Sequence, residues 1–283
     1  MENAIAFDDQ TSLPAIGQGT WYMGEEAARR REEVAALQAG LDAGLTLIDT
    51  AEMYAEGGAE EVVGEALRGR RDSAFVVSKV YPWHAGEVDA IEACERSLRR
   101  LGTDRLDLYL LHWRGNVPLE ETIRAMERLQ QQGKILRWGV SNFDVDDLQE
   151  LLSEPGGAHC ATNQVLYHLA SRGIEFDLLP LCQQRHMPVM AYCPLAQAGR
   201  LRQALFTQPT LLEIASQKQI SVAQLLLAWV IRQPGVMAIP KASSQQHVRE
   251  NAAALQVRLS EADLARIDAA FPPPQHKMAL DVV

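Results

Sequence analysis

Hydrophobic positions along the chain form two kinds of pattern, short apolar runs and longer segments with helical periodicity, and the two kinds alternate. Parallel strands that are covered on both faces produce runs of the first kind. Such runs span residues 13–21, 45–49, 74–79, 105–112, 135–142, 160–165, 187–193 and 235–240. The second kind predicts helices at 25–43, 59–68, 85–101, 118–132, 144–153, 172–185, 221–233, 244–255 and 260–270.

Eight strands that alternate with helices predict either a closed (β/α)₈ barrel or an open, doubly wound sheet. A dinucleotide-binding open sheet usually carries a GxGxxG motif directly after its first strand, and this chain has none there. No linker-like or low-complexity stretch divides the chain. We therefore predict one α/β domain over residues 1–283, a (β/α)₈ TIM barrel with an additional helix at its C-terminal end.

Charge and composition argue against several classes of protein. The formal net charge of −10 disfavours a general nucleic-acid or anionic-membrane surface, because both need clustered cations. The four cysteines are scattered and the histidines lack metal-ligand spacing, so we expect reduced thiols and no metal site. The N-terminus lacks a secretory signal pattern, and no apolar run approaches the roughly 18 residues of a membrane span. The expected location is the cytoplasm.

Polar side chains end almost every apolar run. Taken singly, Asp49 could cap a turn, Tyr54 could be a packed aromatic, Lys79 a solvated strand end and His112 a core histidine. In a (β/α)₈ barrel, however, the strand ends meet at the C-terminal rim, where the active sites of such barrels are built. A shared site explains all of these positions together: Asp49, Lys79, His112, Ser141, Asn142, Gln164, Tyr192 and Lys241.

Asp, Lys, Tyr and His side chains that meet in one pocket suit the protonation of a carbonyl oxygen that is gaining negative charge. A free phenol has a pKa of about 10, too high for efficient proton transfer near neutrality. We expect the Lys79 ammonium to lower the pKa of Tyr54, and Asp49 to keep Lys79 charged. His112 would hold the carbonyl oxygen and help to stabilise its charge. The set contains no reductant, so this chemistry requires a bound cofactor.

Several motifs resemble, in order and spacing, those of the aldo-keto reductases, and they cover nearly the whole chain. They include GQGTW (17–21), IDTAEMY (48–54), LDLYLLHW (106–113), GVSNF (139–143) and IPKASSQQHVREN (239–251). The resemblance implies a (β/α)₈ barrel whose bottom is capped by an N-terminal β-hairpin. It also implies the reversible, nicotinamide-dependent reduction of aldehydes and ketones to alcohols.

The same resemblance implies a role for each candidate residue. Tyr54 would be the general acid, Asp49 and Lys79 the pair that tunes it, and His112 the group that orients the substrate. The substrate pocket would be lined by Trp21, Tyr81, His112 and Trp113. Cofactor contacts are implied for Thr20, Trp21, Asp49, Ser141, Asn142, Gln164, Tyr192, Pro194, Leu195, Ile239, Lys241, Ala242, Ser243, His247, Glu250 and Asn251.

The segment KASSQQHVREN departs from the pattern KSxxxxRxxEN that is familiar in aldo-keto reductases. His247 stands where an arginine commonly grips the 2′-phosphate of NADPH, and Ala242 replaces a hydroxyl residue. A neutral imidazole is a weaker partner for phosphate than a guanidinium group. Because Lys241 is retained and Arg249 is near in sequence, the resemblance still favours NADPH, with NADH as the alternative.

Two other functions fit parts of the pattern. A cofactor-sensing regulatory barrel, similar to the potassium-channel β subunits that share the family fold, would bind cofactor with little turnover. An aldolase or isomerase that forms a Schiff base on Lys79 would need a neutral lysine, which Asp49 opposes by favouring the charged form. Carbonyl reduction is the prediction that uses all four candidate residues.

The chain resembles bacterial family members of the methylglyoxal-reductase type, which implies small carbonyl substrates, including 2-oxoaldehydes such as methylglyoxal. The stretch after Tyr192 and the tail after residue 270 look short, so we expect them to leave an open pocket. No surplus apolar stripe is visible on the predicted helices, so we expect a monomer. The expected partners are small molecules, with no nucleic acid and no membrane.

Overall fold

Every apolar run of the sequence contributes a strand to one parallel sheet in the computed structural model, which describes residues 3–283. Each strand lies beside its neighbours in sequence, from β3 to β10. Bridges from Ile16 to Ala238 and from Gly19 to Lys241 join the first strand to the last, so the sheet curls round on itself. The strands are β3 (Gln18–Gly19), β4 (Leu47–Asp49), β5 (Phe75–Val80), β6 (Leu108–Leu111), β7 (Trp138–Ser141), β8 (Asn163–Leu166), β9 (Val189–Tyr192) and β10 (Val236–Ala238).

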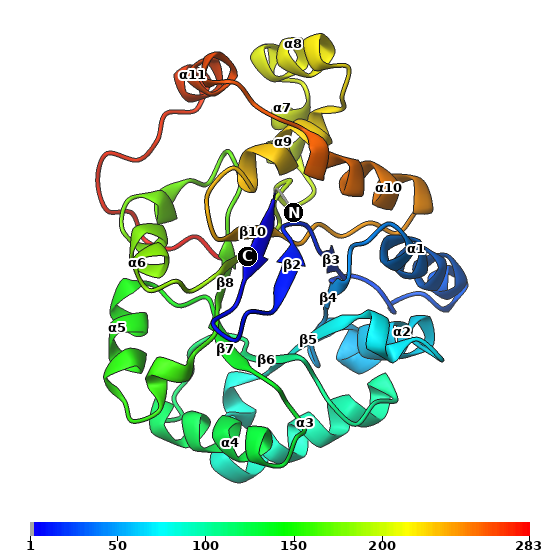
Figure 1. Ribbon diagram of the computed structural model, residues 1–283, viewed down its shortest axis with the longest axis vertical. Coiled ribbons are helices and arrows are strands. Elements are labelled where there is room, and N and C mark those ends of the chain that lie inside the picture. The colour runs from blue at the N-terminus through cyan, green and yellow to red at the C-terminus, as the bar shows by residue number, and fades with distance from the viewer. Residues whose placement is uncertain (1–2) are drawn as a thin grey trace.

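Helices surround the strands and cover the outer face of the sheet (Figure 1). Each helix that the periodicity predicts is present, with ends that differ by a few residues. They are α1 (Arg30–Asp42), α2 (Gly58–Ala66), α3 (Glu87–Leu101), α4 (Leu119–Gln131), α5 (Val145–Ser153), α6 (Leu178–Gln184), α9 (Val222–Val230), α10 (Gln245–Ala253) and α11 (Glu261–Ala270). Among residues 3–283, none of the helices combines the length and the apolar character needed to cross a lipid bilayer.

The sequence prediction lacks two helices, α7 (Arg200–Phe206) and α8 (Pro209–Lys218), which lie between β9 and α9. Only Leu205 of α7 is buried, so this helix has no apolar stripe for the periodicity to detect. The first turn of α8 is capped by the side chain of Gln208, which is not one of the usual N-cap residues. The stretch after Tyr192 is therefore a helical insertion and not a short loop.

The predicted strand at 13–21 is divided between two sheets. Its first residues belong to β2 (Ser12–Pro14), which pairs antiparallel with β1 (Ala4–Ala6), and its later residues form β3. Phe7, in the connection between β1 and β2, stacks on Phe75 at the start of β5, with 5.6 Å between the ring centroids. The hairpin therefore lies at the N-terminal ends of the strands, which is consistent with the predicted cap.

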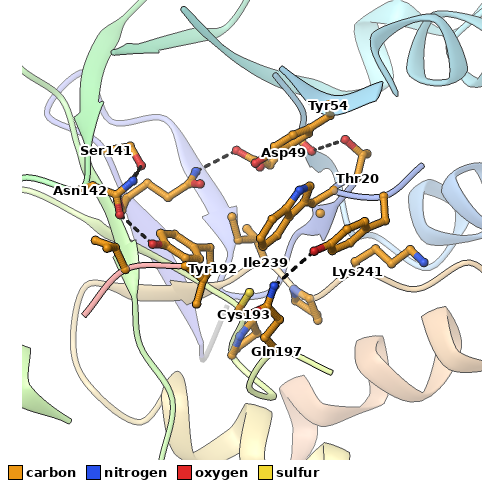
Figure 2. A pocket seen from close by; sticks show the side chains of 18 of the residues that line it. Thr20, Asp49, Tyr54, Ser141, Asn142, Tyr192, Cys193, Gln197, Ile239 and Lys241 are labelled. Carbon is orange, nitrogen blue, oxygen red and sulfur yellow. Dashed lines mark hydrogen bonds between the residues drawn. The ribbon is translucent and has the colours of Figure 1, made fainter. Parts of the chain in front are cut away.

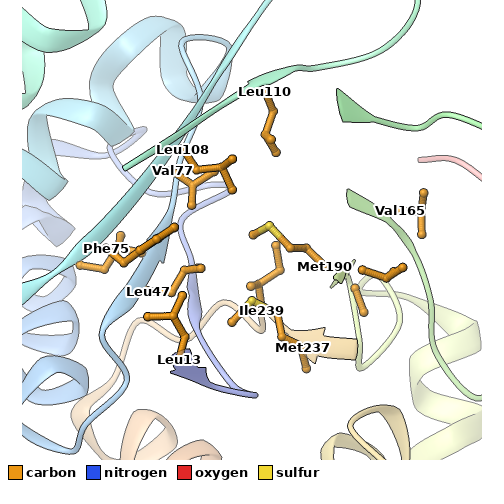
Figure 3. Close-up of a cluster of buried hydrophobic side chains, with 14 of the residues drawn as sticks. Leu13, Leu47, Phe75, Val77, Leu108, Leu110, Val165, Met190, Met237 and Ile239 are labelled. Atoms are coloured by element: carbon orange, nitrogen blue, oxygen red, sulfur yellow. The ribbon is translucent and has the colours of Figure 1, made fainter. Parts of the chain in front are cut away.

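Buried side chains from many strands meet inside the curled sheet (Figure 3). Leu47, Met190 and Met237 are completely buried there. All six residues of β5 are buried, because alternate side chains face the interior and the surrounding helices. Truncating a core side chain of this kind to alanine typically costs about 2–5 kcal/mol. This packing holds the polar residues at the strand ends in fixed positions.

Candidate active site

Lys79 is the centre of a hydrogen-bonded group at the C-terminal ends of β4 and β5. Its ammonium group donates to Asp49 Oδ2 at 2.8 Å, to the carbonyl oxygen of Thr50 at 2.9 Å and to the hydroxyl oxygen of Tyr54 at 3.1 Å. Lys79 is fully buried and Asp49 is 2% exposed. Burying an isolated charge is costly, so the carboxylate and the other two acceptors are what permit a lysine at this position.

A strained turn brings Tyr54 back over this group. β4 ends at Asp49, and Tyr54 begins a short 3₁₀ helix (Tyr54–Gly57) that leads into α2. Ala55 and Glu56 have φ angles of 50° and 51°, a region that residues with a Cβ rarely adopt. Backbone strain of this kind is concentrated at functional sites. The turn sets the Tyr54 ring edge-on to His112, with 5.8 Å between the ring centroids.

Burial controls protonation in this group. It raises the pKa of the Tyr54 phenol well above its ordinary value, and the charge of Asp49 adds to the rise. The sequence analysis expected a lowered pKa for Tyr54, whereas the net shift is upward, because desolvation of the phenol is the largest contribution. Burial also lowers the pKa of His112 to about 2, with a further contribution from the charge of Lys79, so the imidazole is neutral.

These protonation states suit the donation of a proton and not nucleophilic attack. A protonated phenol and a neutral imidazole can each donate a hydrogen bond to one oxygen atom that is gaining negative charge. Burial lowers the pKa of Lys79, and the Asp49 carboxylate opposes that change by favouring the ammonium form. The charged lysine can in turn stabilise the phenolate of Tyr54 while the proton leaves.

A cavity of about 650 Å³ opens beside these residues (Figure 2). Pockets for organic ligands commonly enclose about 300–1,000 Å³, so this one is large enough for a substantial molecule. Most of the residues predicted from the sequence line it, namely Thr20, Trp21, Asp49, Tyr54, His112, Trp113, Ser141, Asn142, Gln164, Tyr192, Pro194, Leu195, Ile239 and Lys241.

Amide and aromatic side chains share one side of the cavity (Figure 2). The Tyr192 hydroxyl donates to Asn142 Oδ1 at 2.7 Å, and Asn142 Nδ2 donates to the carbonyl oxygen of His112 at 3.1 Å. Gln164 Nε2 donates to Asp49 Oδ1 at 2.8 Å. Asn142 has a φ of 59°, so its side chain is presented by an unusual backbone conformation. Planar polar groups are thereby aligned next to the Asp49 and Lys79 pair.

The backbone itself forms part of the cavity wall at Gly19. A Cβ atom at this position would lie 2.7 Å from the carbonyl oxygen of Ile239, a distance that real Cβ atoms do not show. Only glycine therefore allows β3 to approach the segment after β10 this closely. The close approach brings backbone groups to the ligand space.

Some predicted site residues lie outside the cavity lining. Lys79 is buried behind Asp49 and Tyr54 and reaches the cavity only through them. Tyr81 packs edge-on against Trp113, with 6.0 Å between the ring centroids. The remaining ones belong to the segment that leads into α10 and to α10 itself: Ala242, Ser243, His247, Glu250 and Asn251.

The C-terminal tail contributes to the cavity, which the sequence prediction did not anticipate. Val282 and Val283 line it, although the tail was predicted to leave the pocket open. Lys277 holds the tail in place by pairing with Asp144 at 2.6 Å and with Asp177 at 3.1 Å. These partners are more than 90 residues away in sequence, so no local pattern could reveal the contact.

Sequence reasoning also missed lining residues that adjoin predicted ones. Met53 and Cys193 directly precede and follow the predicted residues Tyr54 and Tyr192, and adjacency is the only sequence signal that points to them. Arg202 lies in α7, a helix that was not predicted, so it carried no signal.

The profile of the Aldo/keto reductase family matches residues 15–271. The chain belongs to this family. Methylglyoxal reductase YeaE of Escherichia coli (strain K12) is 65% identical to this aldo-keto reductase over 282 residues, which cover 100% of this chain and 99% of that protein. Glyoxal reductase of Bacillus subtilis (strain 168) is 34% identical over 272 residues, which cover 95% of this chain and 93% of that protein.

Solved structures agree with this assignment. Two crystal structures of an aldo/keto reductase from Klebsiella pneumoniae, one in complex with NADP and acetate and the other with NADPH, each have a TM-score of 0.98. Both are 64% identical to this chain and cover 100% of each chain. These findings confirm the prediction of an aldo-keto reductase, and hence of an oxidoreductase. They also confirm an α/β fold that matches the (β/α)₈ arrangement.

Proposed function

We propose that this aldo-keto reductase uses NADPH to reduce small carbonyl compounds to alcohols, 2-oxoaldehydes such as methylglyoxal among them. One observation carries the proposal: Lys79 hydrogen-bonds to both Asp49 and Tyr54, with a neutral His112 against the phenol, beside a ligand-sized cavity. The proposal treats residues 1–283 as one domain, which the family match over residues 15–271 supports.

Tyr54 is the proposed general acid, and the proton on its hydroxyl passes to the carbonyl oxygen of the substrate. Burial keeps the phenol protonated until an oxygen that is gaining negative charge approaches it. Lys79 then stabilises the phenolate through the hydrogen bond that it already makes at 3.1 Å, and Asp49 keeps the lysine charged. His112 donates a second hydrogen bond to the same oxygen and so fixes its position.

The residues around the cavity fit a nicotinamide dinucleotide. When bound, NADPH supplies the hydride that no side chain of this protein can provide. Asn142 and Gln164 offer amide partners for a carboxamide, and Tyr192 offers a flat ring beside them. Lys241 lies on the opposite side of the pocket from Asn142 and offers a cation to phosphate groups (Figure 2).

Further support for the cofactor comes from the complexes of the Klebsiella pneumoniae relative with NADP and NADPH. The predicted contacts in and before α10 belong to the adenosine end of the same cofactor. Glu250 and Asn251, which match the family pattern, lie on α10 within reach of that end in this proposal.

Substrate size follows from the aromatic and aliphatic walls of the cavity. Trp21 stacks on Tyr54 with 6.3 Å between ring centroids, and Trp113 packs on His112 at 5.0 Å. Tyr81 supports Trp113 from behind, so it acts on the substrate through that ring. A small, compact aldehyde fits between these rings, and the 65% identity to a protein named methylglyoxal reductase supports this choice.

The cofactor-sensing alternative explains less of the site. A sensor needs cofactor contacts but has no use for a proton donor with a buried lysine and carboxylate behind it. The presence of all four residues in hydrogen-bonding or ring contact therefore favours turnover.

The substitution Tyr54→Phe tests the proposed acid, because it removes the hydroxyl and leaves the ring packing intact. We expect kcat/KM for methylglyoxal, followed as loss of NADPH absorbance, to fall by a factor of about 10²–10⁴. The Kd for NADPH should remain unchanged. Tyr109→Phe is the matched control, because the buried Tyr109 hydroxyl has no hydrogen-bond partner among residues 3–283. If Tyr54→Phe turns over methylglyoxal as fast as the wild type, the assignment of Tyr54 as the acid is refuted. If the wild type oxidises no NADPH with any aldehyde, the cofactor-sensing alternative is favoured.

A further inference from the structure

Lys241 is one of the groups that the sequence offers for the 2′-phosphate, and the other two, His247 and Arg249, supply no free guanidinium fork beside it. His247 is exposed on the first turn of α10, and its backbone N–H is bonded to Ser244 Oγ at 3.2 Å. Arg249 donates to Gln245 Oε1 at 3.1 Å and lines a groove between α10 and α1, together with Asp42 and other residues of α1. Arg249 is therefore engaged with its own helix and with this groove.

Arg29 brings a guanidinium group to this place from a distant part of the chain. It ends the 3₁₀ helix (Ala27–Arg29) directly before α1, and α1 packs against α10. Its Nη2 donates to Ser243 Oγ at 3.0 Å, one residue before the N-cap of α10. Ser243 follows Lys241 by two residues, and the charge of Arg29 also acts on Lys241. The guanidinium, the ammonium and the hydroxyl group therefore belong to one neighbourhood, where the adenosine end of the cofactor is proposed to lie.

The positive charge at this point is not neutralised within the protein. Among residues 3–283, neither Arg29 nor Lys241 forms an ion pair with a carboxylate. Burial and the charge of Arg29 lower the pKa of Lys241, and the carboxylates of Glu33, Glu25 and Glu32 oppose the change without reversing it. Two cations that repel each other gain free energy when an anion binds beside both of them.

We propose that Arg29, with Lys241 and Ser243, binds the 2′-phosphate of NADPH and so sets the preference of this protein for NADPH over NADH. The inference rests on the proposed function. A guanidinium group presents its N–H donors in a planar fork that matches phosphate oxygens, and an ammonium group adds a point charge. NADH carries a hydroxyl group in place of this phosphate, so it gains little from either cation.

Two matched substitutions separate this role from general effects of charge. Arg29→Met keeps most of the side-chain length and removes the guanidinium, and Arg249→Met makes the same change in the neighbouring groove. The Kd values for NADPH and NADH are measured for each protein by quenching of tryptophan fluorescence. We expect Arg29→Met to weaken NADPH binding by about 10- to 100-fold, the range for a lost hydrogen bond to a charged group. NADH binding should be nearly unchanged, and Arg249→Met should change neither.

The probes 2′,5′-ADP and 5′-ADP should show the same difference in Arg29→Met without any contribution from the nicotinamide end. Equal loss of NADPH and NADH binding would mean that Arg29 has a structural role and would overturn the proposal, as would unchanged binding of both. An equal effect of Arg249→Met would also overturn it. If Arg29→Met does not fold, Arg29→Lys decides, because a single ammonium should retain only part of the preference. Failure of the proposed function has another signature: a wild type that binds NADPH but oxidises none with any aldehyde would fail as a reductase and leave this inference standing. A wild type that binds neither dinucleotide would overturn both.

Discussion

Replacing Lys79 by methionine tests whether the buried ion pair holds the active site together. The change removes three hydrogen bonds and leaves Asp49 buried with its charge, bonded through its side chain to Gln164. At an effective dielectric constant of about 20, unit charges 2.8 Å apart attract by about 6 kcal/mol, most of which offsets their desolvation. Breaking a buried pair on one side costs about 3–5 kcal/mol, so we expect the free energy of unfolding to fall by that amount.

The double variant Lys79→Met/Asp49→Asn isolates the contribution of the charge. Asparagine removes the unpaired carboxylate, so this protein should be about 1–3 kcal/mol more stable than Lys79→Met alone. Activity should not return, because Tyr54 would still lack its cation. Urea unfolding followed by tryptophan fluorescence measures the stabilities, and loss of NADPH absorbance with methylglyoxal measures the activity.

A surface pair provides the control for this comparison. Lys134 lies 2.5 Å from Glu95, and both side chains are about one-third exposed, so Lys134→Met should cost only about 0–1 kcal/mol. If the changes in the free energy of unfolding caused by the Lys79 and Asp49 substitutions add to within about 0.5 kcal/mol, the two side chains are not coupled. That result would refute the reasoning. Retained turnover in Lys79→Met would refute its catalytic part.

Two further predictions concern pH and backbone packing. Because the pKa of His112 is lowered from 6.5 to about 2, the unfolded chain takes up this proton first as the pH falls. The contribution of the neutral imidazole to the free energy of unfolding is therefore fully present above pH 6.5. At pH 5 the free energy of unfolding is lower by about 2 kcal/mol. His112→Asn should lose that share of the acid sensitivity in urea unfolding, and a pH profile identical to the wild type would contradict the assignment. Gly19→Ala should lower the free energy of unfolding by about 1–3 kcal/mol and weaken NADPH binding, because the new Cβ would lie 2.7 Å from the Ile239 carbonyl oxygen. An unchanged melting temperature of this variant would contradict the prediction, because it would show that β3 can move aside.

Much of the fold and the catalytic group could be predicted because the relevant signals are local. Parallel strands buried on both faces must be almost entirely apolar. Each apolar run therefore predicted a strand, and the polar residue at its end could be identified as a candidate for the site. Asp49, Lys79 and His112 were recognised in this way, and the structure brings them together with Tyr54. The helix α7 was not predicted, because it buries a single side chain, Leu205. A helix without an apolar stripe shows no helical periodicity in its sequence.

The sequence by itself determined the order of the eight parallel strands, the helices that alternate with them and the chemical groups at the strand ends. Only the tertiary structure decided which distant residues join them, such as Arg29 beside Ser243 and Val282 in the cavity wall. It also decided the direction of the Tyr54 pKa, because desolvation depends on how deeply the packed chain buries the phenol. The periodicity of apolar residues predicts which face of a helix or strand is buried, because that signal is local. Contacts between segments far apart in the sequence form only when the whole chain folds, and so does the burial that these contacts create.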